Sequence, residues 1–248
     1  MKVLAVYNVK GGVGKTAAAV NLSYLSARDG ARTLLWDLDP QGAASFYFKV
    51  EPKVPGGTKK LLEGKKELDS IVRGTDYERL DLLPADYSYR KLDLALAETK
   101  RPSQTLAKLI GPLVESYDVL FLDCPPSLSI LAESLFALSD ALIVPTIPTP
   151  LSLRALVQLS EHLKEKGPQD LKVLPFLSMV DRRKLLHREP QWLQKNAPYQ
   201  LLKTQIPYSS LVETMGLRQQ PVAAYAHSSL SGQAFEALWK EIRRKIGW

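Results

Sequence analysis

Apolar runs of strand length alternate with segments of helical periodicity along most of the chain. The runs are rich in Val, Ile and Leu and nearly uninterrupted, which is typical of strands covered on both faces of a sheet. Strands are expected over residues 2–7, 32–36, 80–84, 117–122, 141–145 and 173–177. Helices are expected over residues 16–28, 103–115, 127–138 and 151–166. The polar stretch over residues 49–79, with its prolines and glycines, predicts a loop and short helices. The alternation predicts an α/β fold in which a doubly wound, mostly parallel sheet is flanked by helices.

The size and composition of the chain fit one folded unit. With 248 residues, 45% of them hydrophobic, it can bury a sizeable core, so we expect a single domain over residues 1–248. The longest apolar stretches, such as residues 141–150, are too short to span a membrane, and the first residues lead into a strand rather than a signal peptide. We therefore expect a cytoplasmic protein. The one cysteine, Cys124, cannot form an internal disulfide and is interpreted as a packing residue.

Basic residues are unevenly distributed along the chain. Residues 1–150 contain 18 Lys and Arg against 18 Asp and Glu, whereas residues 151–248 contain 15 against 8. The net charge of +7 therefore lies wholly in the second segment. Such an excess can draw an anionic polymer or a lipid surface to one face of a protein, and a solvated basic surface without a partner is an equally good interpretation.

The segment from Lys10 to Thr16 reads K-G-G-V-G-K-T and follows the first expected strand. It matches the phosphate-binding pattern G-x-x-x-x-G-K-[ST] except at the first position, where Val9 stands in place of glycine. Between a strand and a helix, small residues let successive backbone N–H groups surround a phosphate chain. Lys15 then reaches the terminal phosphates, and the Thr16 hydroxyl can ligate Mg²⁺. The predicted nucleotide-binding residues of this loop are Gly11, Gly12, Val13, Gly14, Lys15, Thr16 and Ala17.

Two further motifs follow expected strands: D-L-D-P-Q-G over residues 37–42 and D-C-P-P-S-L over residues 123–128. The carboxyl ends of strands in an open parallel sheet converge on one crevice, so Asp37, Asp39 and Asp123 are expected to face the phosphate loop. A single aspartate at a strand end is usually a helix cap or a turn residue. Three beside a phosphate loop favour Mg²⁺ binding and water chemistry. The predicted metal-site residues are Thr16, Asp39 and Asp123.

These motifs resemble those of the ParA/MinD family of ATPases, whose variant phosphate loop is K-G-G-x-G-K-T, and the resemblance covers nearly the whole chain. The D-C-P-P form is closer to the ParA-type partition ATPases than to MinD. The resemblance implies ATP with Mg²⁺ and a homodimer in the ATP-bound state. In the family, the lysine that corresponds to Lys10 reaches the partner subunit's nucleotide, whereas those that correspond to Lys15 and Thr16 serve their own subunit.

The resemblance also implies roles for two aspartates. Asp39 is expected to position the attacking water, and Asp123 is expected to hold Mg²⁺ through water. Lys10, Lys15 and Asp39 are thus the predicted catalytic residues. Ala17 stands where the family usually has a second threonine, so one side-chain contact to the α-phosphate is expected to be lost.

Two downstream segments, residues 178–183 and 206–210, resemble the family's sequences around the adenine. Met179, Asp181 and Pro207 are the candidates for contacts with the base, and simple packing at the core edge with loop capping is an equally good interpretation. The family often has a basic residue directed at DNA immediately after the Ile-Pro pair. Here that position is Tyr208, a departure from the family's pattern.

The resemblance implies an ATP-dependent dimerising ATPase that binds DNA without sequence preference and segregates or positions a plasmid, a chromosome region or a protein cargo. Slow hydrolysis that is stimulated by a small ParB-like or cargo-adaptor protein, and association with the nucleoid, are expected on the same basis. The basic residues available for contacts with DNA phosphates are Arg182, Arg183, Lys184, Lys195, Lys203, Arg218, Arg243, Arg244 and Lys245.

A MinD-like switch at a membrane surface is the alternative function. Apolar residues recur at helical spacing between Phe235 and Ile246, and the basic residues 243–245 could meet anionic lipid. The same stripe is more typical of a terminal helix packed on its own sheet. A third alternative is a regulatory or metabolic ATPase of the same superfamily that binds neither DNA nor lipid.

Overall fold

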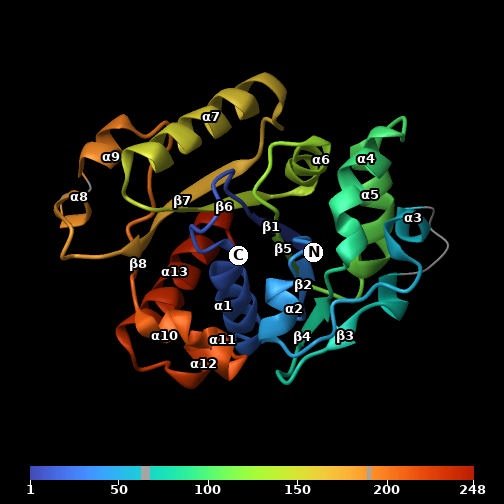
Figure 1. Ribbon diagram of the computed structural model, residues 1–248, viewed down its shortest axis with the longest axis horizontal. Helices are drawn as coiled ribbons and strands as arrows, with labels where there is room; N and C mark the ends of the chain where they lie inside the picture. The colour runs from blue at the N-terminus through green and yellow to red at the C-terminus, as the bar shows by residue number, and fades with distance from the viewer. Residues whose placement is uncertain (63–67, 189–190) are drawn as a thin grey trace.

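The computed structural model describes residues 1–62, 68–188 and 191–248, in which eight strands form one sheet between two layers of helices (Figure 1). Part of the expected loop over residues 49–79, namely residues 63–67, lies outside the described residues. The strands are β1 (Lys2–Val6), β2 (Thr33–Asp37), β3 (Arg73–Gly74), β4 (Leu80–Leu83), β5 (Val119–Asp123), β6 (Ala141–Thr146), β7 (Lys172–Val180) and β8 (Gln205–Pro207).

The strand order is β3-β4-β2-β5-β1-β6-β7-β8, and every neighbouring pair is parallel except β3 with β4. The expected doubly wound, mostly parallel sheet is therefore confirmed. Because the strands run the same way, the carboxyl ends of β1, β2 and β5 lie side by side at one edge. All the residues of β2, β5 and β6 are buried, which explains why these segments read as continuous apolar runs.

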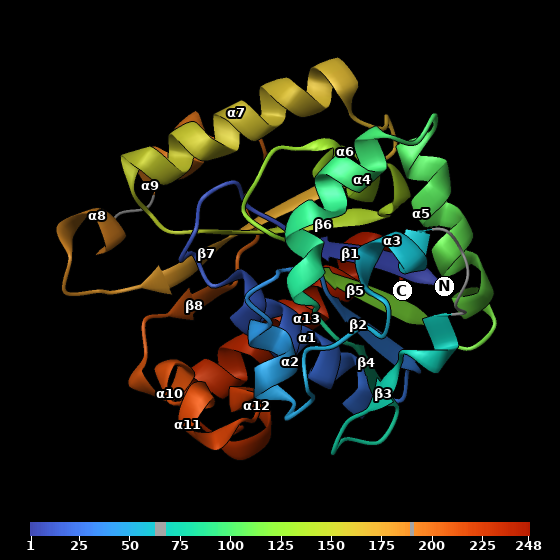
Figure 2. The same ribbon diagram turned by 45° about the vertical axis from the view of Figure 1, so that its right-hand side comes forward.

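Two hydrophobic cores lie on the two faces of the sheet, because alternate residues of a strand point to opposite sides. From β1, Val3 and Ala5 enter the core on the face covered by α7 (Pro150–Lys166), whereas Leu4 and Val6 enter the core on the face covered by α1 (Lys15–Arg28). Figures 1 and 2 show the same two layers of helices. The longer helices are α1 (Lys15–Arg28), α5 (Pro102–Ile110), α6 (Ile130–Leu138), α7 (Pro150–Lys166) and α13 (Leu230–Ile246).

Short helices fill most of the connections. Several follow the strands on the side of the sheet that carries the candidate site, and their sequences are too short for a periodic pattern to reveal. They are α2 (Ala43–Tyr47), α3 (Gly57–Leu62), α4 (Leu92–Ala97), α8 (Leu185–Arg188), α9 (Gln191–Asn196), α10 (Ser210–Glu213), α11 (Met215–Arg218) and α12 (Val222–Tyr225).

Two expected helices differ from the prediction at one end. The helix expected over residues 103–115 stops at Ile110, where a 3₁₀ turn, Gly111–Val114, takes over because Pro112 cannot donate the hydrogen bond that an α-helix needs. The helix expected over residues 127–138 begins only at Ile130. Its N-cap is Ser129, whose hydroxyl accepts a hydrogen bond from the backbone N–H of Ala132.

The apolar stripe near the C-terminus is buried in α13. Phe235, Leu238, Trp239, Ile242 and Ile246 all lie in the core on the α1 face of the sheet. The indole N–H of Trp239 also donates to the Asp29 carboxylate at the end of α1. The structure thus agrees with the interpretation of a terminal helix packed on its own sheet.

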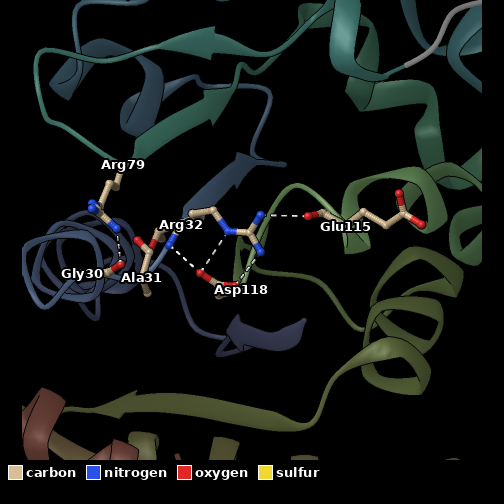
Figure 3. A network of polar contacts seen from close by, with 7 residues as sticks. Gly30, Ala31, Arg32, Arg79, Glu115 and Asp118 are labelled. Carbon is tan, nitrogen blue, oxygen red and sulfur yellow. Dashed lines mark hydrogen bonds and ion pairs between the residues drawn. The ribbon is translucent and has the colours of Figure 1, made fainter.

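The amino ends of β2 and β5 are clamped by an ion pair at the edge of the sheet opposite the candidate site (Figure 3). The Arg32 guanidinium donates to both carboxylate oxygens of Asp118 at 2.8 and 3.2 Å, and to the backbone oxygen of Glu115 at 2.8 Å. This geometry lowers the pKa of Asp118 to about 2, mainly through the hydrogen bonds from Arg32. The clamp is structural and holds the register between the two strands that carry Asp37 and Asp123 at their other ends.

Candidate nucleotide-binding site

The phosphate loop connects β1 to α1 at the edge where the strands end. Gly12 and Gly14 have φ angles of +70° and +89°, in the left-handed region that other residues adopt only with strain. A Cβ atom on Gly14 would also lie 3.1 Å from the Ser178 hydroxyl at the end of β7. The glycine at this position therefore lets the loop turn into α1 and lets β7 approach it. The first N–H groups of α1, which have no acceptors within the helix, open towards this loop.

Both lysines of the loop are held by groups of the protein. The Lys15 ammonium lies 3.2 Å from the backbone oxygen of Lys10, and its side chain is buried. Burial lowers the pKa of Lys15, while the negative charges of Asp123 and Asp39 oppose this effect. The Lys10 ammonium lies 3.4 Å from the hydroxyl of Ser152 in α7.

Asn8 fixes the start of the loop. Its amide nitrogen donates to the Pro145 oxygen at the end of β6, at 2.8 Å, and its amide oxygen accepts from the backbone N–H of Lys10, at 2.9 Å. The side chain is buried between these partners. The loop is thereby attached to the strand that leads into α7.

Two aspartates stand side by side at the ends of neighbouring strands. Asp37 closes β2 and Asp123 closes β5, and the two residues are register partners. Both side chains are buried, and burial followed by their mutual repulsion raises the pKa of Asp123 well above the ordinary value. Burial also raises the pKa of Asp37 to about 6, although hydrogen bonds from Ser45 oppose the shift. This placement confirms that strand topology brings the two distant motifs together.

The oxygens of these aspartates provide a test of the metal prediction. Within the described residues, both carboxylate oxygens of Asp123 and one of Asp37 are buried without a hydrogen-bond partner. Buried unpartnered carboxylates are costly unless a cation compensates them. The Thr16 hydroxyl lies close enough to Asp123 to lower the pKa of its carboxyl. The hydroxyl of Thr16 and the carboxylate of Asp123 are oxygen ligands, the type that Mg²⁺ prefers. The residues present therefore fit Mg²⁺.

Asp39 lies two residues beyond Asp37, in the turn that leads to α2. It is half-buried, and one of its carboxylate oxygens accepts from the backbone N–H of Gln41 at 3.0 Å. Its charge acts on Lys15 and Asp123. Across the described residues, His, Cys, Asp and Glu do not gather in groups of three that could hold a metal ion unaided. Mg²⁺ in nucleotide sites is bound by one or two protein oxygens together with phosphates, so this finding agrees with the donor set.

A pocket of about 430 Å³, its open mouth included, lies beside the loop. Gly14 and Ala17 form its phosphate-loop side, and Met179 and Pro207 line the opposite side. Met179 has a φ angle of +53°, an uncommon conformation for a residue with a side chain. Two of the three base-contact candidates therefore line a pocket that borders the phosphate loop.

The third candidate, Asp181, does not line this pocket. Its carboxylate accepts three hydrogen bonds from Arg183, and these lower its pKa to about 2. Tyr208 lines the pocket instead, with its hydroxyl donating to Glu213. Asp181 thus lies outside the lining of the pocket with both carboxylate oxygens bonded to Arg183, and its contact with a base stays a prediction.

The basic candidates for DNA contacts do not form one cluster. Residues 182–184 follow the end of β7, whereas Lys245 lies at its beginning, where its backbone oxygen accepts from Lys172. The nine residues of β7 separate these groups by roughly 26 Å. Arg183 forms an ion pair with Asp181, and Arg243 forms one with Asp29. Lys195 lies in α9, and the Arg218 guanidinium lies over the Tyr225 ring.

A second pocket gathers three cations on one side of α13. Its lining includes Lys203, Lys240 and Arg244, of which Lys240 also pairs with Glu236 at 3.2 Å. The Glu241 carboxylate in the same pocket accepts from two backbone N–H groups, those of Lys203 and Thr204. Lys240 was not among the candidates from sequence, because only the packing of α13 beside residue 203 brings it next to Lys203.

Other functional contacts also escaped prediction from the sequence. Asn8 bonds to Pro145 and Ser152 bonds to Lys10 across long sequence separations. Ser45 donates from α2 to Asp37 through both its N–H and its hydroxyl. Common polar residue types at these positions give no signal without the tertiary contacts. Cys124 is buried as expected, and burial raises the pKa of its thiol.

Comparison with known proteins gives a family match. The model of a family described as an AAA domain matches residues 1–172. A Pseudomonas putida protein of uncharacterized function is 31% identical, over 98% of this chain and 95% of its own length. The chromosome-partitioning ATPase Soj of Treponema pallidum is 28% identical, over 99% and 98% of the two chains.

The fold has a similar solved counterpart. The septum site-determining protein MinD of Pyrococcus horikoshii, complexed with Mg-ADP, matches with a TM-score of 0.81 and 25% identity. The match covers 99% of this chain and 97% of that one.

Proposed function

The chain belongs to the family matched over residues 1–172, the ParA/MinD-type P-loop ATPases, and we propose that it is a partition or positioning ATPase that dimerises with ATP and binds DNA. The expected cargo is a plasmid, a chromosome region or a protein, and residues 1–248 act as one ATPase domain. The observation that carries the proposal is the meeting of the phosphate loop, the buried Lys15 and the unpartnered oxygens of Asp37 and Asp123 at one edge of the sheet.

The chemistry proposed for this edge is transfer of the terminal phosphoryl group of ATP to water. Mg²⁺, when bound, would supply positive charge to the phosphate oxygens, and Thr16 and Asp123 are the residues that would hold it. Lys15 and the N–H groups at the start of α1 bind and orient the phosphates. Asp39 orders the attacking water, and Lys10 adds positive charge at the partner subunit's nucleotide. The pocket lined by Met179 and Pro207 takes the adenine.

Two substitutions separate phosphate binding from water positioning. Lys15→Ala should abolish nucleotide binding, because no other side chain of the loop brings an ammonium to the terminal phosphates. Asp39→Ala should leave ATP affinity within about threefold and stop turnover, so that an ATP-bound dimer accumulates. Calorimetry measures nucleotide affinity, phosphate release measures turnover, and the mass from light scattering measures dimerisation. Full turnover in the Asp39 variant would refute its role in the reaction.

We assign DNA binding to the pocket on α13 that holds Lys203, Lys240 and Arg244, because three cations there converge on one surface. One subunit offers few phosphate contacts, so pairing two such pockets in an ATP dimer should raise affinity steeply. A small ParB-like or cargo-adaptor protein is the proposed stimulator of hydrolysis. Anisotropy with DNA of unrelated sequences, in ATP and in ADP, tests this; equal binding in both states would contradict it.

The membrane alternative receives less support from the structure. The apolar stripe of α13 that would enter a bilayer is already packed in the core. Among the helices in residues 1–62, 68–188 and 191–248, none is long and apolar enough to cross a membrane. Sedimentation with anionic liposomes, with and without ATP, distinguishes a lipid-bound protein from the DNA-bound one proposed here.

A further inference from the structure

The ammonium of Lys10 is engaged inside its own subunit. It lies 3.4 Å from the Ser152 hydroxyl, and that hydroxyl lies 3.0 Å from the hydroxyl of Thr149. Ser152 is fully buried in the first turn of α7, and its backbone N–H is capped by the same Thr149 side chain. With Lys10 donating, the Ser152 hydroxyl is left to donate to Thr149, so the three groups form one chain of hydrogen bonds.

The backbone of Lys10 ties this contact to the phosphate site. Its N–H donates to Asn8, and its oxygen accepts from the Lys15 ammonium. Phosphates that attract Lys15 compete with the Lys10 oxygen, since a charge-assisted bond to phosphate is stronger than one to a neutral carbonyl. Nucleotide binding thereby removes one of the contacts that fix Lys10.

We propose that Ser152 is a positioning residue that retains Lys10 within its own subunit in the nucleotide-free protein and so opposes premature dimerisation. The inference rests on the proposed function, in which Lys10 acts on the partner's nucleotide. The contact between Lys10 and Ser152 is weak. Ser152 is a neutral acceptor, and the positive end of the α7 dipole disfavours an ammonium beside the first turn. A phosphate of the partner's nucleotide therefore outcompetes it.

The contact is tested first in the nucleotide-free protein. Ser152→Ala removes the acceptor, and Ser160→Ala is its matched control, since Ser160 is buried in the same helix with a hydroxyl that has no hydrogen-bond partner in the described structure. Acylation of Lys10 by an amine reagent, measured on its peptide by mass spectrometry, should accelerate roughly two- to tenfold in the Ser152 variant only. An unchanged rate, or an equal rise in the control, overturns the proposal.

The consequence is tested by dimerisation. Two lysines are released per dimer, so Ser152→Ala should lower the dissociation constant of the ATP dimer roughly 4- to 100-fold relative to wild type and the Ser160 control. A dimer that is unchanged or weaker overturns the proposal. Lys10→Ala separates the two hypotheses. If that variant dimerises and hydrolyses ATP normally, the intersubunit role of Lys10 fails, whereas a weakened Lys10 variant beside an unaffected Ser152 variant refutes the retention alone.

Discussion

The buried carboxylate of Asp37 predicts that the nucleotide-free protein loses stability as the pH rises. A folded-state pKa of about 6 against an ordinary value of 3.8 means that the folded protein binds this proton more tightly than the unfolded chain does. The contribution of Asp37 to the free energy of unfolding is therefore highest below pH 3.8, falls between pH 3.8 and 6, and stays low above that window. The shift of about 2.2 units corresponds to a loss of about 3 kcal/mol at pH 7.5.

Substitution of this residue should recover that free energy. Asp37→Asn removes the charge but keeps an amide oxygen that can accept the hydrogen bonds from the N–H and hydroxyl of Ser45. We expect the free energy of unfolding at pH 7.5, without Mg²⁺ or nucleotide, to increase by up to about 3 kcal/mol. For a chain of this length, that gain corresponds to a rise in Tm of about 6–12 °C. The gain should vanish near pH 4.

Urea unfolding from pH 4 to pH 8, followed by the fluorescence of the buried tryptophans, provides the measurement. Asp118→Asn is the control of opposite sign, because Arg32 lowers the pKa of Asp118 to about 2. The stability that the ionised Asp118 carboxylate contributes is present above pH 3.8 and is lost as the pH falls towards 2. This ion pair is largely exposed, so the control variant should lose at most about 1 kcal/mol at pH 7.5. A less stable Asp37 variant at pH 7.5, or a gain that does not depend on pH, would show that the reasoning about buried charge is wrong.

Two further predictions concern the loop and the DNA surface. Gly14→Ala should weaken nucleotide binding at least about tenfold and cost about 1–3 kcal/mol of stability, because its φ is +89° and the added Cβ meets β7. Gly30 has a φ of +100° but open space around it, so Gly30→Ala should lower stability without changing nucleotide affinity. Equal nucleotide affinity of the two variants in calorimetry would contradict the role of the loop in nucleotide binding. Joint replacement of Lys240 and Arg244 by alanine removes four cations per ATP dimer, which should lower DNA affinity and reduce the salt slope by about 4. Arg243 does not line this pocket, so Arg243→Ala should change the salt slope little. An equal loss in an anisotropy salt series would mean that the surface is assigned wrongly.

Most of the fold follows from local pattern. Fully buried parallel strands produce apolar runs that can be recognised in isolation, and the loop from Lys10 to Thr16 stands between a strand and a helix as predicted. The burial of Asp37 and Asp123 beside each other follows from topology, because parallel strands bring their carboxyl ends to one edge. Element boundaries do not follow from the pattern: α6 begins at Ile130, after its Ser129 cap, rather than at the first residue after the prolines.

The sequence by itself determined the phosphate-loop motif, because the geometry of such a loop demands glycines, a lysine and a hydroxyl at fixed spacing. The tertiary structure alone decided what surrounds them. Lys10 meets Ser152 across 142 residues, and Asn8 meets Pro145 across 137. It also turned Asp181 towards Arg183, outside the lining of the pocket beside the loop. Such contacts depend on how helices pack on a sheet, and no local pattern of hydrophobic and polar residues encodes the orientation of a side chain towards a distant segment.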